Sequence, residues 1–417
     1  MIKVSIMTIG DEICIGQIVN TNASWIASQC TAVGAKIINH FAVPDERDAM
    51  INGLDMLINN SDFVLITGGL GPTHDDITKP VLTKYFNDTL VLHEPTFKRL
   101  KEMYKKRGSE FLERNKCLAY LPSKCRVLSN NAGAAPGMLF EQNGKYIIAM
   151  PGVPSEMKEI LLNHVLPFIK NEIINKKSDV VLYKTLNTIG IPESHLADLL
   201  GNPDEFLNSG SLAFLPSYKG VKLRIGFASE NSETAQEEIS KIEKYIRSRA
   251  GRFISGIGEE VIADTVGKLL KEKSKTVSVA ESCTGGLLGG AFTDIPGSSD
   301  YFIGGVIVYS NAAKLNILGV PKEIIDKFGA VSEETAIELA KNVREKFNTD
   351  YGISVTGIAG PGGGTQEKPV GTVWIGISDS KISVANKFVF ADDRTVNREL
   401  FVGRALGLLY MKLMDRL

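Results

Sequence analysis

The segment TVSVAESCTGG, residues 276–286, points to an α/β fold and to a reactive turn. Its first part is rich in β-branched residues, which favours a strand. Gly285 and Gly286 then predict a sharp turn, and the apolar residues after them predict the start of a helix. Free backbone N–H groups and the positive end of the helix dipole lie at such a place. Ser282, which lies in this turn, is therefore a candidate for a functional hydroxyl group.

Strand-like apolar runs alternate with amphipathic helical segments along the whole chain, which predicts α/β layers. A chain of 417 residues favours two or three domains. The polar stretch at residues 171–179 and the Gly256-Ile257-Gly258 turn are candidate boundaries. We therefore expect a first domain at residues 1–170, a small α/β connector at 171–256 and a last domain at 257–417.

The composition is typical of a globular protein, with 43% hydrophobic and 23% charged residues. A net charge of -1 gives no basic bias toward nucleic acid. No apolar run reaches the roughly 18 residues of a membrane helix, and the N-terminus has no signal-peptide pattern. The cytoplasm is the expected compartment. Five cysteines without a C-x-x-C pair argue against a disulfide framework and a zinc site.

Ser282 needs a base to become a nucleophile. All five histidines precede the last domain, so Lys314 is the better candidate, in the manner of Ser-Lys pairs. An unperturbed lysine has a pKa of about 10.4, so Lys314 must be buried or lie near a cation to be neutral. Tyr309 is placed to relay a proton or to position Ser282, and N–H groups after Ser282 are candidates for an oxyanion hole. The alternative is that Ser282 caps a helix and Lys314 is a solvated surface residue.

A Gly-rich loop at residues 356–364 follows a strand-like run at 351–355. Its glycines allow close backbone approach to a ligand, and its N–H groups are suited to an anion. Arg394 and Arg398 are four residues apart and share one face of a helix, where they are candidates to clamp a phosphate. A solvated helix face is the alternative.

Residues 257–417 resemble the C-terminal domain of the CinA family (competence/damage-inducible protein A), which also occurs alone as nicotinamide mononucleotide deamidase. The resemblance is carried by AESCTGG at 280–286, IPGSS at 295–299, YSNAAK at 309–314, GAVSEE at 329–334 and GIAGPGGGTQEKPVGTVWIG at 357–376. It implies hydrolysis of the carboxamide to nicotinic acid mononucleotide and ammonia, without a cofactor. The implied catalytic residues are Ser282 as nucleophile, Lys314, Tyr309 and Thr356.

The same resemblance implies substrate contacts along these motifs. The residues concerned are Glu281, Cys283, Thr284, Gly285, Gly286, Asn311, Gly357, Gly360, Arg394 and Arg398. Where the family has a GDR-x-x-VR-like segment, this chain has Asp392 in place of the glycine and Asn397 in place of the valine. Both arginines are kept, but an added carboxylate near a phosphate is repulsive.

In the first domain, TGGLGPTHDDIT at 67–78 follows an apolar strand. Its glycines and successive N–H groups are suited to a phosphate. The adjacent carboxylates of Asp75 and Asp76 are suited to a hard divalent cation, and Asp11 and Glu12 follow the first strand at the same sheet edge. The alternative is that Asp75 and Asp76 cap a helix.

This half resembles the other CinA domain, which is related to the MoaB/MogA molybdopterin-binding fold. The matching segments are TIGDEI at 8–13, G-x-x-x-NTN at 16–22, TGGLGPTHDDIT at 67–78, NNAGAAPG at 130–137 and PGVPSEM at 151–157. The resemblance implies hydrolysis of ADP-ribose to AMP and ribose 5-phosphate with a divalent metal ion (Mg, Mn or Co), with K+ as a further candidate. The implied substrate contacts are Gly68, Gly69, Gly71, Thr73, Asn20 and Asn22, and the implied metal ligands are Asp75, Asp76, Asp11 and Glu12.

The connector resembles the family's small α/β unit through TIGIPESHLADLLG at 188–201 and LPSYKGVKLRI at 215–225. Taken together, the resemblance predicts a bifunctional pyridine-nucleotide salvage hydrolase that acts on nicotinamide mononucleotide and ADP-ribose, assembles as a homodimer, and contacts neither membrane nor nucleic acid. Two alternatives stay open. The first domain binds molybdopterin or a nucleotide without turnover, or the chain is a competence or DNA-repair interaction protein.

Overall fold

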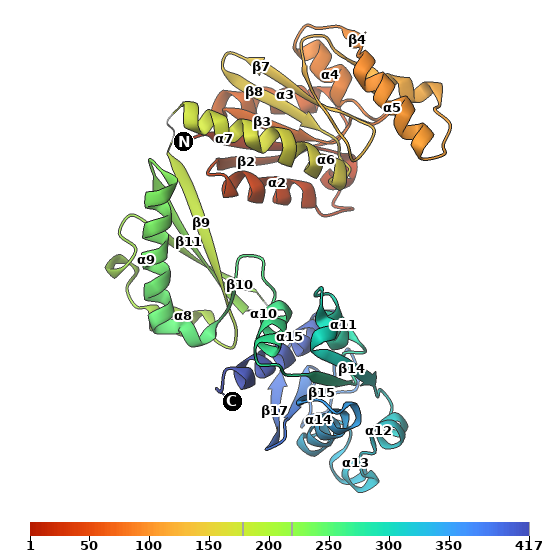
Figure 1. Cartoon of the computed structure of the whole chain (residues 1–417), viewed down its shortest axis with the longest axis vertical. Helices are drawn as coiled ribbons and strands as arrows, with labels where there is room; N and C mark the ends of the chain where they lie inside the picture. The colour runs from red at the N-terminus through yellow and green to blue at the C-terminus, as the bar shows by residue number, and fades with distance from the viewer. Residues whose placement is uncertain (177–178, 218–219, 417) are drawn as a thin grey trace. The chain divides into compact units, whose positions relative to one another are not determined.

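The structure, a computed structural model, describes residues 1–176, 179–217 and 220–416. Residues 177–178 of the expected linker and residues 218–219 of the connector motif lie outside the described residues. The chain divides into two compact units, one of residues 1–183, 209–211 and 226–241 and the other of residues 184–208, 212–225 and 242–417. Both are mixed α/β, which confirms the predicted fold class (Figure 1).

The first domain is built on a six-stranded sheet in the order β2-β1-β3-β8-β7-β6. Four neighbouring strands, β2, β1, β3 and β8, run parallel, and β7 and β6 are antiparallel. The strands are β1 (Lys3–Ile9), β2 (Lys36–Val43), β3 (Phe63–Thr67), β6 (Arg126–Leu128), β7 (Gly137–Gln142) and β8 (Lys145–Met150), and a separate pair is β4 (Leu90–Leu92) and β5 (Tyr120–Pro122). The carboxyl ends of the four parallel strands therefore meet at one edge.

Helices cover both faces of this sheet because side chains along each strand alternate between two apolar cores. Ile6 of β1 packs in the core shared with α2 and α6, whereas Met7 packs in the core shared with α3 and α4. The helices are α1 (Asp11–Cys14), α2 (Thr21–Ala32), α3 (Arg47–Asn60), α4 (Thr78–Tyr85), α5 (Glu94–Lys106), α6 (Pro154–Ile160) and α7 (Leu166–Asn175).

Helix α7 extends into the stretch whose polar composition predicts a linker. Residues 171–175 are helical, because Ile169 and Ile173 are four residues apart and both are buried against the sheet. The apolar spacing therefore outweighs the polar composition at this boundary.

The connector is a four-stranded sheet in the order β10-β11-β9-β12 with two helices. Its elements are β9 (Val180–Thr188), α8 (Glu193–Leu200), β10 (Ser211–Ser217), β11 (Gly220–Ser229), α9 (Ser232–Ala250) and β12 (Ile254–Ile257). Ala235, Ile239, Ile242 and Ile246 of α9 are all buried, as their helical spacing predicts.

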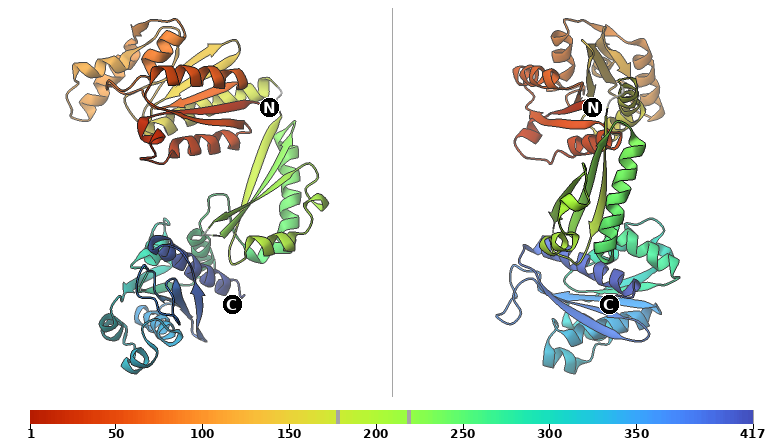
Figure 2. Two further views of the ribbon diagram at one scale, coloured as in Figure 1. Left: turned by 180° about the vertical axis from the view of Figure 1, so that it is seen from behind. Right: turned by 90° about the vertical axis from the view of Figure 1, so that its left-hand side faces the viewer.

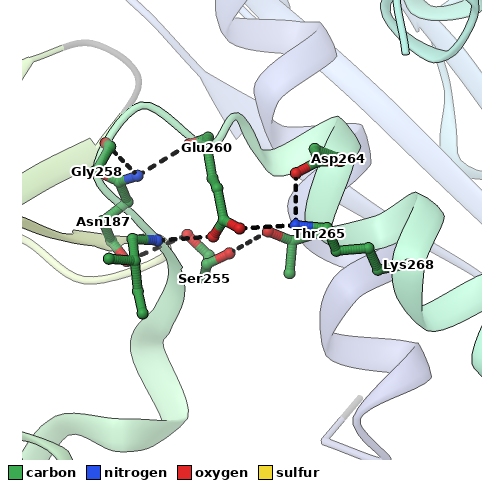
Figure 3. Close-up of polar contacts among 8 residues, drawn as sticks. Asn187, Ser255, Gly258, Glu260, Asp264, Thr265 and Lys268 are labelled. Atoms are coloured by element: carbon green, nitrogen blue, oxygen red, sulfur yellow. Dashed lines mark hydrogen bonds and ion pairs between the residues drawn. The ribbon is translucent and has the colours of Figure 1, made fainter. Parts of the chain in front are cut away.

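A polar network ties the end of β12 to the first helix of the last domain, α10 (Ile262–Glu272). The side-chain amide of Asn187 donates to the carbonyl oxygens of Gly258 at 3.1 Å and Glu260 at 2.9 Å (Figure 3). The carboxylate of Glu260 accepts the N–H of Ile257 and an ion pair from Lys268. The Gly256-Ile257-Gly258 boundary is thus a bonded turn.

The last domain has a five-stranded sheet in the order β14-β13-β15-β16-β17. β13 (Val277–Glu281) lies parallel between β14 (Phe302–Ile307) and β15 (Tyr351–Gly357), while β16 (Thr372–Ser378) and β17 (Ser383–Val389) are antiparallel. Helices cover both faces (Figure 2). Helices α10, α11 (Leu287–Thr293) and α15 (Arg394–Leu413) share one apolar core with the sheet, and α12 (Asn311–Leu318), α13 (Lys322–Phe328) and α14 (Glu333–Phe347) share the other.

Within the described residues, none of the helices is both long enough and apolar enough to span a membrane.

Candidate active site

Ser282 lies directly after β13, in the turn that the sequence predicts. Its backbone N–H donates to the carbonyl oxygen of Val355 at 2.9 Å, which fixes it beside the end of β15. Gly285 and Gly286 then take φ values of 60° and 98°, a left-handed backbone that glycine adopts without steric cost. The chain enters α11 at once, so the strand, turn and helix are all present.

Lys314 is the buried partner of this serine. Its side chain extends from α12, and its Nζ lies 3.1 Å from Ser282 Oγ. The residue is 1% exposed, and Nζ also donates to the carbonyl oxygens of Val308 at 2.8 Å and Tyr309 at 3.1 Å. Burial lowers the pKa of Lys314. The structure thus brings together two residues that are 32 positions apart in the sequence.

Glu281 shapes the turn from inside the fold. The residue is 2% exposed, and its carboxylate accepts the N–H groups of Gly286, Leu288 and Gly289 at 3.0, 3.0 and 2.8 Å. A carboxylate at the start of a helix satisfies N–H groups that have no partner within the helix. We therefore assign Glu281 to the turn rather than to the substrate contact that the resemblance implies, because its oxygens already accept backbone groups.

Cys283 and Thr284 also face inward. Cys283 belongs to the apolar core, and burial raises the pKa of its thiol to about 12, so the reactive thiolate form is suppressed. Thr284 is fully buried, and its hydroxyl oxygen has no hydrogen-bond partner among the described residues. The side chains of both residues are therefore buried in the fold.

Tyr309, Asn311 and Thr356 have different surroundings. Tyr309 is 63% exposed and its hydroxyl lies 3.4 Å from a guanidinium nitrogen of Arg394. Asn311 is an exposed residue in the first turn of α12. Thr356 is buried at the end of β15 and donates its hydroxyl proton to the carbonyl oxygen of Ala330 at 2.7 Å. Tyr309 and Asn311 are thus open to a ligand, whereas Thr356 holds the strand end.

The Gly-rich loop leaves β15 in close contact with neighbouring backbone. A Cβ atom at Gly357 would lie 2.7 Å from the carbonyl oxygen of Thr372, so only glycine fits there. Gly360 has a φ of 94°, and its carbonyl oxygen accepts a hydrogen bond from Arg394 at 2.7 Å. Residues 361–367 of the following segment are exposed.

A cavity of about 410 Å³ lies at the carboxyl edge of the sheet in the first domain. Its lining includes Gly68, Gly69, Gly71 and Glu12, which follow parallel strands, together with Asp75 and Asp76. The carboxylate of Asp76 accepts the N–H groups of Gly71 at 2.7 Å and Thr73 at 2.9 Å. Asp76 therefore holds the glycine loop in its turn.

The predicted residues Asn20, Asn22 and Asp11 do not line the cavity but bond backbone groups of the same domain. Asn20 caps α2 by accepting the N–H of Ala23 at 3.0 Å, and the amide of Asn22 donates to the carbonyl oxygen of Gly152 at 2.7 Å. The carboxylate of Asp11 accepts the N–H of Asp45 at 3.1 Å. These side chains bond the loops around the cavity to one another.

The four predicted metal ligands share this edge but do not form one coordination group. In residues 1–176, 179–217 and 220–416, no three His, Cys, Asp or Glu side chains are arranged to hold a metal ion. Asp76 and Asp11 in addition accept hydrogen bonds from backbone N–H groups of the surrounding loops. The donor set therefore does not fit a resident divalent cation as it stands.

Sequence reasoning missed two acidic residues of the cavity, Asp45 and Glu156. Burial raises the pKa of Asp45, and the nearby carboxylates of Asp11 and Glu12 add to the shift. Signals for both were present in the sequence. Asp45 follows β2, whose carboxyl end lies beside that of β1, and Glu156 lies in the PGVPSEM segment.

Three family models match consecutive parts of the chain. A probable molybdopterin binding domain matches residues 5–171, a damage-inducible protein CinA KH domain matches residues 183–256, and a CinA C-terminal domain matches residues 259–413. Curated relatives match along the whole length. A CinA-like protein of Salinibacter ruber is 40% identical, with 97% of this chain and 98% of that protein covered. A CinA-like protein of Cytophaga hutchinsonii is 39% identical, with 99% of each covered.

The chain belongs to the CinA family. Among solved structures, the competence/damage inducible protein CihA from Agrobacterium tumefaciens is 39% identical over 37% of this chain and 93% of that chain, with a TM-score of 0.36.

Helix α15 contacts several parts of the site. Arg398 donates to the carbonyl oxygens of Cys283 at 3.1 Å and Thr284 at 2.7 Å, so it holds the Ser282 turn. Arg394 is exposed and holds Gly360, as described above. Of the two arginines expected at a phosphate, only Arg394 thus stands open at the surface. Asn397, which lies between them in the sequence, is fully buried.

Proposed function

We propose that this CinA-family protein hydrolyses the carboxamide of nicotinamide mononucleotide in its last domain, with Ser282 as nucleophile and Lys314 as base. The observation that carries the proposal is the buried pair of Ser282 Oγ and Lys314 Nζ at 3.1 Å. A lysine must be neutral to accept a proton, and burial lowers the pKa of Lys314 in the required direction.

In the first step, neutral Lys314 takes the hydroxyl proton of Ser282 while Oγ attacks the carboxamide carbon. The negative oxygen of the tetrahedral intermediate requires N–H donors. Gly285 and Gly286 already bond within the turn, so we assign this role to the N–H groups of residues 283 and 284. Collapse of the intermediate breaks the C–N bond, and Lys314 returns the proton to the departing ammonia.

The ester on Ser282 is then hydrolysed. Lys314 takes a proton from water, the resulting hydroxide attacks the ester carbon, and Ser282 regains its proton as nicotinic acid mononucleotide leaves. The phosphate of the substrate is assigned to Arg394, because its guanidinium is exposed beside Tyr309 and the Gly-rich loop. Arg398 acts on the Ser282 turn instead.

The test is incubation of the purified protein with nicotinamide mononucleotide while ammonia and nicotinic acid mononucleotide are measured. Ser282→Ala and Lys314→Met are each expected to lose at least about 100-fold in kcat, since each removes a group that reacts. Ser380→Ala, at an exposed serine of the same domain outside the motifs named above, is the matched control and keeps its rate. Normal turnover by Ser282→Ala would contradict the assigned nucleophile.

For the first domain we propose binding and hydrolysis of ADP-ribose, and the observation that favours it is the cavity with its glycine loop and acidic wall. Since the carboxylates do not fit a three-ligand cation site, no metal-dependent step is assigned to them. AMP and ribose 5-phosphate are measured with and without Mg2+, Mn2+ or Co2+. Glu12→Gln with Asp45→Asn removes two carboxylates of the cavity wall and tests whether that wall takes part in the hydrolysis. Thermal stabilisation by ADP-ribose without product would favour a binding domain instead.

A further inference from the structure

Asn397, near the start of α15, is a polar residue with a buried side chain. Asn397 is 0% exposed, and its amide nitrogen donates to the carbonyl oxygens of Ala359 at 3.1 Å and Asp392 at 2.7 Å. Its amide oxygen has no partner among the described residues. A buried polar atom without a partner costs free energy that an apolar side chain would avoid. The benefit of an amide at this position therefore lies in the two hydrogen bonds that its nitrogen donates.

These bonds act together with Arg394, which lies three residues earlier on the same helix face. Asn397 holds the carbonyl of Ala359, and Arg394 holds the next carbonyl along the Gly-rich loop, that of Gly360 at 2.7 Å. The bond from Asn397 to Asp392 also closes the turn that leads into α15. Two consecutive peptide groups of the loop are thus bonded to one face of the helix.

We infer that Asn397 is a positioning residue that fixes the Gly-rich loop against α15 and so places Arg394 for the substrate phosphate. The second half of this inference rests on the proposed deamidase function, whereas the anchoring of the loop does not. The Ser282 turn is held by other bonds: Arg398 donates to the carbonyl oxygens of Cys283 and Thr284, and the N–H of Ser282 donates to the carbonyl oxygen of Val355. Loss of Asn397 should therefore weaken substrate binding more than the chemical step.

The chain offers a matched control for this test in Asn187. Like Asn397, it donates its amide to two backbone carbonyls, those of Gly258 and Glu260, and its amide oxygen has no partner among the described residues (Figure 3). Those carbonyls belong to the turn before α10 and not to the candidate site. Asn187→Leu and Asn397→Leu therefore remove equivalent bonds at different places.

The variants are compared by steady-state kinetics with nicotinamide mononucleotide and by hydrogen exchange in the folded proteins. Asn397→Leu is expected to raise KM on the order of tenfold or more while kcat stays within about threefold. It should also speed amide exchange in residues 357–371 and leave the pH profile of kcat unchanged. Asn187→Leu should change none of these. Asn397→Ser keeps one hydroxyl donor, so an intermediate effect is expected, and it serves where the leucine variant does not fold.

Three results would overturn the inference. Unchanged KM and exchange in the Asn397 variants would show that the loop does not depend on this amide. A fall in kcat at constant KM would place Asn397 in the chemical step. Equal effects of Asn187→Leu would mean that both residues contribute only to the general stability of the fold. If the wild-type protein does not turn over nicotinamide mononucleotide, the proposed function fails, while exchange in residues 357–371 still decides whether Asn397 anchors the loop.

Discussion

At the scale of single residues, the charge of Lys314 decides whether Ser282 can react. The lysine is surrounded by the Ser282 hydroxyl and two carbonyl oxygens, and burial disfavours its charged form. Deprotonation therefore occurs below the value of about 10.4 for an exposed lysine. We predict that kcat/KM for nicotinamide mononucleotide rises with pH along a limb that reports this lowered pKa. Lys314→Arg should be inactive at every pH, because a guanidinium stays protonated.

The same residue predicts a pH dependence of stability. Between the lowered pKa in the folded protein and the ordinary value in the unfolded chain, the unfolded chain binds more protons. The free energy of unfolding should therefore rise with pH through this window, relative to Lys314→Met, which lacks the titrating group. Urea unfolding of both proteins at several pH values measures the difference. A constant difference across the window would mean that Lys314 titrates normally in the folded state.

Cys283 lies beside the nucleophile but is expected to be inert. Its pKa is raised to about 12 by burial in the apolar core, so the thiolate is scarce at neutral pH. We predict that iodoacetamide leaves turnover of nicotinamide mononucleotide unchanged while it modifies the exposed thiol of Cys117. Mass spectrometry of the treated protein identifies the modified residues. Loss of activity that follows modification of Cys283 would contradict this interpretation.

At the scale of elements, two glycine residues of the last domain are expected to have opposite effects on stability when each is replaced by alanine. A Cβ atom at Gly352 of β15 would lie 2.1 Å from the carbonyl oxygen of Ala340 in α14, so the strand and helix approach too closely for a side chain. At Gly403 of α15, a Cβ atom would meet no described atom within 4 Å. We predict that Gly352→Ala destabilises the domain by about 1–3 kcal/mol, whereas Gly403→Ala stabilises it by about 0.5–1 kcal/mol. Urea midpoints of the two variants test the contrast.

Elements were predictable from the sequence where the signal is local. The β-branched run and glycine pair at 276–286 predict β13 and its turn. Ser332 is of a residue type favoured at helix N-termini, and it caps α14 ahead of Glu333. Local sequence patterns do not show which residue a side chain contacts when that residue lies far away in the sequence. The bonds from Arg398 to the Ser282 turn, 115 residues away in the sequence, depend on how α15 packs on the sheet. The helical spacing alone therefore predicts Arg398 at a phosphate, and the anchoring bonds of Asn397 cannot be inferred from the local sequence.

At the scale of the whole molecule, the two candidate sites follow one topological rule. Gly68 follows the parallel strand β3, and Ser282 follows the parallel strand β13, so both functional loops lie at the carboxyl end of parallel strands. This rule made both loops predictable from the strand pattern. It did not predict how the polar groups in each loop are used, since Asp76 and Glu281 both bond backbone N–H groups of their own loops.

The division into two compact units predicts how the molecule unfolds. Each unit has its own apolar cores, so calorimetry should resolve two transitions rather than a single two-state one. Nicotinamide mononucleotide is added to the Ser282→Ala variant, which does not consume it. It should raise the midpoint temperature of only one transition, that of the unit containing the last domain. At about 100 times Kd this stabilisation amounts to about 2.7 kcal/mol. ADP-ribose should raise the midpoint temperature of the other transition only. If either ligand shifts both transitions together, the two units are energetically coupled, and binding at one candidate site must then alter the other.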